Sequence, residues 1–510
     1  MCLVLPVSLQ AQGNPANTLP LLGDGSDMSA SAERRLGDRI ARELFRDPDL
    51  IDDPVLTDYV QGVWQPLLAA ARVRGDLTPE LDERFAWRIV LGRDRSVNAF
   101  ALPGGYFGLH LGLLAVVNSR DELASVLGHE LSHVTQRHIS RLISKNNQQT
   151  PWMIGAMILG ALAASKSPEA GNALIVGGQA LSAQSQLNFS RDMEREADRV
   201  GFGVMTQAGF EAQGFVGMFD KLQQAARLND TGAYPYLRSH PLTTERMADM
   251  QSRLPLGAPH TVDVVPGMTH AMLTARARVL SSSGVDALRL WRAQADDARL
   301  VSQAPAQQAG ILYGAAMAAS RMRDAAQARK QWERLQQVAA QEPEAARQAR
   351  WLGVEIELAA RDLSRPQILA LGDSIGLDPA KPAAVAQLRR PEMLLQAQIA
   401  AQSGQIGVID RVAQSLQVWL VGEPQDALAW QWLASLYTAQ NQSLRALRAD
   451  AEARVAQLDY AGALDRLMAA QDRLKAASAS GTPADHIEAS IIDARRRQIE
   501  VLLKEQALES

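Results

Sequence analysis

The stretch VLGHELSHVTQRH, residues 126–138, places three histidines and one glutamate within ten residues. His129 and His133 are four residues apart, so on a helix their imidazoles lie on one face, one turn apart. Two imidazoles placed in this way can bind one zinc ion. Glu130 points about a quarter-turn away, where it can reach a water molecule held on the metal. The spacing therefore predicts a metal-dependent hydrolase with Glu130 as the general base.

The alternative is that these are solvent-facing or hydrogen-bonded core histidines. Against it, the surrounding helix is apolar, and an unpaired imidazole is costly to bury. Gly128, directly before His129, also permits close approach of a backbone or a substrate. We interpret His138 as uninvolved, because it lies nine residues after His129 on a different part of the expected helix. The remaining histidines have no partner at ligand spacing and are interpreted as structural or exposed: His110, His260, His270 and His486.

A catalytic zinc usually takes three protein ligands and leaves a fourth place for water. Because the chain has a single cysteine, the third ligand should be a carboxylate from a later helix. Glu194 and Asp198, in NFSRDMEREADRVGF, are four residues apart on one face. Glu194 can bind zinc, while Asp198 accepts a hydrogen bond from a ligand imidazole or serves as a proton donor. The alternative is a solvated charged face, which the neighbouring arginines suggest: Arg191, Arg195 and Arg199.

The elements that position these residues follow from periodicity. Residues 29–68 read as two helices, each with a Ser or Asp N-cap. Residues 85–91 alternate like a strand, and residues 98–114 read as two short strands joined at Pro103-Gly104-Gly105. A single long helix is then expected from residue 119 to residue 144. A small sheet thus precedes the histidine-bearing helix.

Two apolar stretches follow that helix, WMIGAMILGALAA and ALIVGGQALSA. Each is well short of the roughly 20 residues that a membrane span needs. We expect buried helices or a hydrophobic cover beside the site, in preference to membrane insertion.

Composition limits the class of protein. A chain of 510 residues with 47% apolar residues is expected to fold as two or more domains. The net charge of −4 provides no basic field for nucleic acid. The single cysteine, Cys2, excludes internal disulfides and a cysteine-rich zinc site. Residues 1–28 begin apolar and lack Lys and Arg, as the end of a secretory signal peptide does, although a disordered apolar tail is the alternative.

The C-terminal half is expected to be a separate, all-helical domain. Residues 254–270 are rich in Pro and Gly and form the predicted linker. Beyond it, residues 311–344 and 424–457 each resemble a helix pair close to the ~34-residue tetratricopeptide period. The expected organisation is therefore a flexible N-terminus at 1–28, a mainly helical metalloprotease domain with a small β-sheet at 29–253, the linker, and tetratricopeptide-type helical repeats at 271–510.

LASVLGHELSHVTQRH followed by SRDMEREADRVGF resembles the M48 family of zinc metallopeptidases. NAFALPGGYFGLHLGLL resembles that family's strand segment beside the cleft, and RSHPLTTERM resembles its Ser/Thr-His-Pro element. The resemblance implies a zincin-like fold with one Zn²⁺ per chain. Its ligands would be His129, His133 and Glu194, with Glu130 as the base and Asp198 as the aspartate of the family's Glu-x-x-x-Asp motif.

His240, in the Ser-His-Pro element, allows three interpretations. As a fourth metal ligand it would hold the enzyme silent until a substrate or partner moves it. As a hydrogen-bond donor it would stabilise the tetrahedral intermediate. It can also simply precede the next helix.

With its secretory-type start and helical repeats, the chain is most similar to periplasmic members of the M48 family in Gram-negative bacteria. That resemblance implies an endopeptidase that degrades misfolded or stalled beta-barrel proteins, and repeats that act as a chaperone and contact the outer-membrane assembly machinery. Substrate is expected to pair with an edge strand formed by Asn98, Ala99, Phe100 and Ala101. The alternative function is a repeat adaptor or chaperone with a latent or vestigial protease site.

Overall fold

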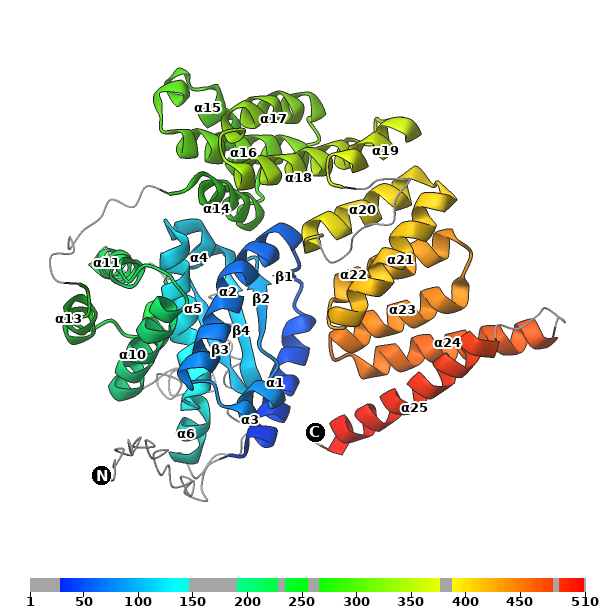
Figure 1. Cartoon of the computed structure of the whole chain (residues 1–510), viewed down its shortest axis with the longest axis horizontal. Helices are drawn as coiled ribbons and strands as arrows, with labels where there is room; N and C mark the ends of the chain where they lie inside the picture. The colour runs from blue at the N-terminus through cyan, green and yellow to red at the C-terminus, as the bar shows by residue number, and fades with distance from the viewer. Residues whose placement is uncertain are drawn as a thin grey trace, which may run out of the picture.

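The computed structural model describes residues 28–145, 190–227, 234–255, 266–376, 388–479 and 486–508. Within these ranges the chain is mainly helical, with one four-stranded sheet in its N-terminal part (Figure 1). The mainly α class with a small sheet is therefore confirmed. None of the helices in the described ranges combines the length and apolar character that crossing a membrane requires.

Several sequence predictions lie outside the described residues. They are the signal-peptide remnant up to residue 27, the apolar stretches at 152–164 and 173–183, His260, and residues 256–265 of the predicted linker.

The sheet has the strand order β1-β2-β4-β3. Its strands are β1 Leu50–Ile51, β2 Arg88–Gly92, β3 Ala99–Leu102 and β4 Tyr106–His110. β2 and β4 run parallel, and the other pairs are antiparallel. The predicted hairpin is confirmed: a 3-10 turn at Pro103–Gly105 joins β3 to β4, and its two glycines have φ of 71° and 81°, which L-residues rarely adopt. The strand predicted at 85–91 begins three residues before β2 and ends one residue before the end of β2, and residues 111–116 form a helix, not a strand.

Helices cover both faces of the sheet (Figure 1). α1 (Ala30–Phe45) packs on the face that carries Tyr106. α2 (Pro54–Arg74) and α5 (Arg120–Thr135) pack on the face that carries Phe107 and Leu109. Successive strand residues point to opposite faces of the sheet, so neighbouring residues of β4 contribute to two different apolar clusters. The side chains of Ser29 and Asp53 cap the first two helices, as predicted.

The long helix predicted from 119 to 144 is two helices. α5 ends at Thr135 and α6 (His138–Lys145) starts after a break in which Arg137 has φ of 54°. A left-handed residue cannot continue an α-helix, so the chain changes direction there.

The other helices of the N-terminal part are α3 Pro79–Arg84, α4 Leu111–Val116, α10 Arg191–Gln207, α11 Gln213–Arg227, α12 Tyr236–Ser239 and α13 Thr244–Ser252. α10 packs across α5, and α11 and α13 pack beside it. Together α5, α10 and the segment from α12 to α13 form the layer that carries the candidate site.

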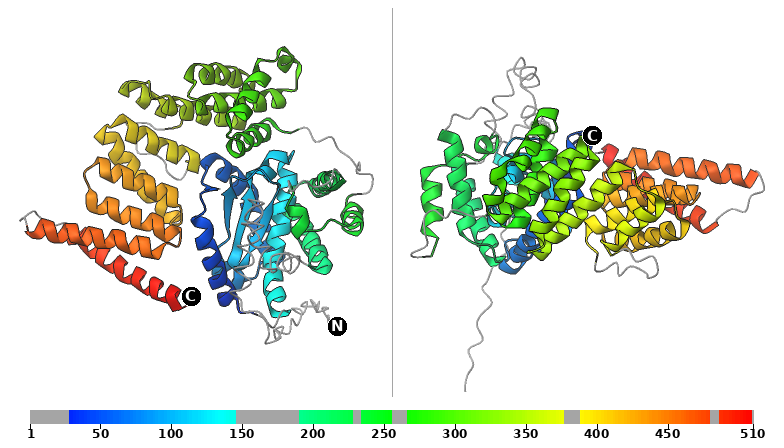
Figure 2. Two further views of the ribbon diagram at one scale, coloured as in Figure 1. Left: turned by 180° about the vertical axis from the view of Figure 1, so that it is seen from behind. Right: turned by 90° about the horizontal axis from the view of Figure 1, so that it is seen from above.

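The rest of the described chain is all-helical and curves around one side of the sheet-containing part (Figure 2). Its helices are α14 Met268–Ser281, α15 Val285–Asp296, α16 Pro305–Arg321, α17 Ala325–Ala339, α18 Pro343–Ala360, α19 Arg365–Asp373, α20 Arg390–Ser403, α21 Ile406–Gly422, α22 Ala427–Ala439, α23 Ser443–Ala456, α24 Tyr460–Ala479 and α25 His486–Leu508, with a 3-10 turn at Ala298–Ser302. The pairs α16/α17 and α22/α23 coincide with the two predicted helix pairs. α14 already begins at Met268, inside the predicted linker.

Candidate metal centre

Four buried side chains from three segments converge on one point. They are His129 and His133 of α5, Glu194 of α10, and His240 directly after α12, and one ligand atom from each lies within 4.8 Å of the others. The two α5 imidazoles face each other with their Nε2 atoms 3.0 Å apart. Glu194 Oε1 lies 3.4 Å from His133 Nε2 and 3.0 Å from His240 Nδ1. The predicted ligands are thus brought together.

A close helix crossing makes this convergence possible. α5 and α10 meet at Gly128 and Gly201, where a Cβ on Gly201 would lie 2.9 Å from the backbone of Gly128 and His129. Only glycine permits two helix backbones to approach so closely. Gly128 was expected to admit a backbone or a substrate, and the structure places the backbone of α10 there.

Asp198 lies one turn beyond Glu194 and faces the first ligand. Its Oδ1 is 2.9 Å from His129 Nδ1, so His129 Nε2 is the nitrogen left for a metal. The charged-face alternative is therefore wrong for these two carboxylates, both of which are buried. It holds for the neighbouring Arg195, which forms surface ion pairs with Asp192 and Glu245.

Arg246 of α13 places one positive charge beside the two buried carboxylates. It donates to both oxygens of Asp198, at 2.6 and 2.8 Å, and its Nη1 lies 2.8 Å from Glu194 Oε2. Burial disfavours the charged form of Asp198, but hydrogen bonds from Arg246 and His129 outweigh it and lower the pKa of that carboxyl. Both carboxylates are therefore anionic at neutral pH.

The imidazoles differ in charge when no metal is bound. Burial opposes protonation of His129, but its hydrogen bonds to Asp198 and Glu194 raise its pKa to about 9. Burial and the neighbouring His129 charge lower the pKa of His133 well below its usual value. A divalent cation would take the place of the His129 proton between these groups.

Glu130 is buried, and neither of its oxygens makes a hydrogen bond within the described residues. Its Oε1 lies 3.5 Å from His240 Nε2, beside the four converging donors. A buried carboxylate without hydrogen bonds is costly, so it marks a place where water or a ligand belongs. Two neutral imidazole nitrogens, a carboxylate and this neighbouring base fit a divalent metal ion.

His240 is positioned by its own helix and by Tyr236. The Tyr236 ring lies 4.7 Å from the His240 ring, and the Tyr236 amide donates to the carbonyl of Val97, just before β3. The interpretation of His240 as merely the residue before a helix is therefore incomplete, because its Nδ1 contacts Glu194 and lies 3.4 Å from His129 Nε2.

The interpretation of His138 as uninvolved is wrong. Its Nδ1 lies 2.9 Å from His133 Nδ1, because the break between α5 and α6 turns it back toward the site. His110 and His270 have structural contacts, as expected: His110 contacts Ser96 and His270 contacts Tyr59, both away from the metal centre. His486, at the start of α25, is exposed as expected.

Arg246 and Tyr236 were not identified from the sequence. Arg246 belongs to the stretch RSHPLTTERM, but nothing in its spacing says that it returns to α10. The role of Arg246 becomes visible only when the structure places it beside the two buried carboxylates. The one available signal was the need of Glu194 and Asp198 for a counter-charge once both are buried.

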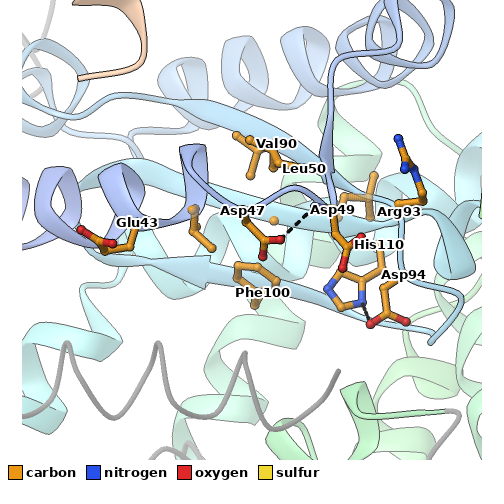
Figure 3. A pocket seen from close by; sticks show the side chains of 13 residues that line it. Glu43, Asp47, Asp49, Leu50, Val90, Arg93, Asp94, Phe100 and His110 are labelled. Carbon is orange, nitrogen blue, oxygen red and sulfur yellow. Dashed lines mark hydrogen bonds and ion pairs between the residues drawn. The ribbon is translucent and has the colours of Figure 1, made fainter. Parts of the chain in front are cut away.

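The expected substrate strand is at an edge of the sheet. Among the described strands β3 pairs only with β4, through Ala99 to Leu102, and it contacts α5. Asn98 precedes the strand, and its carbonyl accepts from the His110 amide. The Phe100 side chain lies over Gly108, in a pocket on the α1 face that also includes His110 (Figure 3). That pocket is on the far side of the sheet from α5.

Comparison with known proteins identifies the region that carries this site. Residues 61–254 match the family model described as Peptidase family M48. The matched range contains α5, α10 and α13.

Several proteins to which the chain is similar in sequence are named as proteases or a metalloendopeptidase. The chain is 33% identical over 245 residues to the beta-barrel assembly-enhancing protease of Escherichia coli, covering 48% of each chain. It is 32% identical over 270 residues to the protein of that name in Yersinia pestis, covering 52% of this chain and 53% of the relative. It is also 32% identical over 164 residues to the mitochondrial metalloendopeptidase OMA1 of Arabidopsis thaliana, covering 32% of this chain and 31% of the relative. The chain thus spans about half the length of the bacterial relatives that it matches.

Proposed function

Because residues 61–254 match the model of peptidase family M48, we propose that the chain is a zinc-dependent endopeptidase. The observation that carries the proposal is the convergence of four buried donors beside Glu130, a buried base that has no hydrogen-bond partner in the described part of the chain. His129, His133 and Glu194 would hold one Zn²⁺. Bound there, zinc would polarise the scissile carbonyl and make a water molecule more acidic.

Residues of the chain would transfer the proton and position the metal ligands. Glu130 takes a proton from the attacking water and returns it to the leaving amine. Asp198 fixes the tautomer of His129 by accepting its Nδ1 proton, and Arg246 holds Asp198 in place. Burial of the whole group excludes bulk water and strengthens each electrostatic interaction.

His240 is proposed either as a fourth ligand that silences the resting enzyme or as a donor to the tetrahedral intermediate. Its Nδ1 reaches the ligand cluster and its Nε2 lies 3.5 Å from Glu130, so both roles are within reach. A peptidase assay of a His240→Ala chain separates them: activity rises if His240 is a latch and falls if it is a donor.

Substrate is proposed to bind as an additional strand along β3, at Asn98, Ala99, Phe100 and Ala101. Backbone pairing at this edge selects extended, unfolded segments more than particular sequences. Such segments are abundant in outer-membrane proteins that have failed to assemble.

We further place this activity in the periplasm, in outer-membrane protein assembly and quality control. The names of the bacterial relatives support this setting. In this proposal the enzyme degrades misfolded or stalled beta-barrel proteins. The helical region beyond Met268 acts as tetratricopeptide-type repeats, with a chaperone-like role, and contacts the assembly machinery. A second candidate is an adaptor whose repeats act without catalysis, which the extended series of helix pairs favours.

One substitution tests the enzyme and separates the two functions. Glu130→Gln keeps the shape of the side chain but removes its basicity, so zinc should stay bound while cleavage of an unfolded protein falls by at least ~100-fold. Glu80→Gln, on exposed α3, is the matched control and should retain activity. Cleavage that persists in Glu130→Gln would remove this mechanism. Barrel assembly that persists without cleavage would favour the adaptor.

A further inference from the structure

His138 contacts the proposed metal ligand His133 on the side of its ring that faces away from the ligand cluster. On an uninterrupted helix, residues five apart are rotated by roughly 140° and do not face each other. Here the left-handed Arg137 breaks the helix, and the His138 ring returns to lie 4.9 Å from the His133 ring, with their Nδ1 atoms 2.9 Å apart. His138 is fully buried.

The contact continues to a charged pair on α10 and α6. His138 Nε2 lies 3.0 Å from Glu196 Oε2, and Arg141 Nη1 lies 2.8 Å from the same oxygen. Glu196 points to the opposite side of its helix from the ligand Glu194, only two residues earlier. α10 therefore contributes both to the metal centre, through Glu194, and to its support, through Glu196.

Only one arrangement of protons suits a metal on His133. His133 Nε2 faces the ligand cluster, so its Nδ1 must carry the ring hydrogen. That N–H donates to His138 Nδ1, which accepts. His138 Nε2–H then donates to the Glu196 carboxylate, which Arg141 holds. In this series of hydrogen bonds, the ring N–H of His133 and the ring N–H of His138 each have an acceptor.

The break that creates this contact is itself anchored. A left-handed backbone costs a non-glycine residue roughly 1–2 kcal/mol. The Arg137 guanidinium offsets this by pairing with the buried Glu33 of α1, at 2.9 Å, and by donating to the carbonyl of Met28. The direction of α6 is thus fixed by the contacts of Arg137 with α1 and with Met28, which precedes that helix.

We propose that His138, oriented by Glu196, is a positioning residue that fixes the tautomer and ring orientation of the metal ligand His133. The inference rests on the metal centre proposed above. It explains why the third histidine of HELSHVTQRH is buried although it binds no metal itself. Residues that orient a metal-bound imidazole typically contribute about 10- to 100-fold in metal affinity.

The test measures metal binding and not activity. The dissociation constant for Zn²⁺ is measured on the full chain by competition with a chromogenic chelator, together with the visible spectrum of the Co²⁺-loaded protein. His138→Leu removes the acceptor and should weaken Zn²⁺ binding by about 10- to 100-fold and shift the Co²⁺ bands. His138→Asn retains an oxygen near the position of Nδ1 and should recover part of the affinity. His110→Leu removes another buried histidine, remote from the metal, and should leave both readouts unchanged.

A surface substitution covers the case in which His138→Leu does not fold. Glu196→Gln changes a side chain that is 38% exposed, keeps the fold, and should weaken Zn²⁺ binding by a few-fold. Asp192→Asn, which removes an exposed carboxylate from the same helix, should not. Unchanged affinity and spectrum in folded His138→Leu, or in Glu196→Gln, overturn this inference alone. If the wild-type chain does not bind Zn²⁺, the proposed metal centre fails with it.

Discussion

At the scale of residues, the main feature of the candidate centre is that several charged side chains are buried together. Glu194 and Asp198 bring two carboxylates to one buried face of α10, and Arg246 supplies one cation in return. One negative charge remains, and near neutral pH the His129 proton compensates it when no metal is bound. A divalent ion held by His129, His133 and Glu194 would replace that proton and would add a further positive charge beside Glu130. The residues around the ligands thus favour a metal electrostatically before any bond forms.

His270, a buried histidine away from the metal centre, should make the free energy of unfolding depend on pH. His270 Nε2 donates to the carbonyl of Val117, and its Nδ1 lies 2.5 Å from the Tyr59 hydroxyl. Burial lowers the pKa of His270, against a smaller opposite effect of the Val117 hydrogen bond. The folded state therefore keeps His270 neutral at a pH where the unfolded state already protonates it.

We expect the free energy of unfolding to fall as the pH drops below about 6.5, because the unfolded chain then binds more protons than the folded chain. His270→Gln keeps a donor toward Val117 but cannot be protonated. Between about pH 7.5 and about pH 5.5 it should lose less stability than the wild type, by at most roughly 1.4 kcal/mol per pH unit. Urea denaturation at each pH measures the difference. His486→Gln, at an exposed histidine, should follow the wild type, and a parallel profile for His270→Gln would contradict the assignment.

At the scale of elements, the crossing of α5 and α10 decides whether the ligands meet. Gly201→Ala would place a Cβ 2.9 Å from backbone atoms of Gly128 and His129, which cannot move aside as a side chain can. We expect a loss of roughly 1–3 kcal/mol in the free energy of unfolding. We also expect weaker Zn²⁺ binding, since the helices that carry Glu194 and His129 must separate.

Gly203→Ala, two residues later on α10, is the matched control. The three atoms nearest to its Cβ would all belong to the guanidinium end of Arg74, which is partly exposed and can move. Alanine also has the better helix propensity, by about 1 kcal/mol, so this variant should be as stable as the wild type or slightly more stable. Urea denaturation and chelator competition measure both effects. Equal stability and equal Zn²⁺ affinity in the two variants would show that the close crossing does not position the ligands.

Features that depend on residues close together in the sequence were predictable, and features that depend on contacts between distant residues were not. The spacing of His129 and His133 within a helix, and the glycines of the β3–β4 turn, are local signals, and both were read correctly. The break at Arg137 was missed because its left-handed backbone is stabilised by Glu33, which is 104 residues away in sequence. The contact of Arg246 with Asp198 likewise joins residues 48 apart. His138 was misjudged for the same reason, since its direction depends on that break.

At the scale of the whole molecule, the beginning of α2 joins the two parts of the chain. Asp53, which caps α2, is paired with the buried Arg276 of α14 at 2.8 Å. Asp52 is paired with Arg390, the first residue of α20, and Asp58 is paired with Arg389, which caps that helix. The same arginines also bind carboxylates of the helical region, so each pair is part of a network. The sheet-containing part and the helical region should therefore unfold together.

Arg276→Met tests this coupling. Arg276 is 3% exposed and binds Asp53, Glu355 and the hydroxyl of Tyr313. Its removal leaves two carboxylates without their cation, so we expect a loss of roughly 3–5 kcal/mol in the free energy of unfolding. Because the lost contacts join the two parts, urea denaturation followed by tryptophan fluorescence should change from one transition to two. Arg299→Met, which removes an arginine that is 85% exposed and pairs locally with Asp297, should retain the single transition and the denaturation midpoint of the wild type. A single, unshifted transition in Arg276→Met would mean that packing between α14 and α4, and not the buried ion network, holds the two parts together.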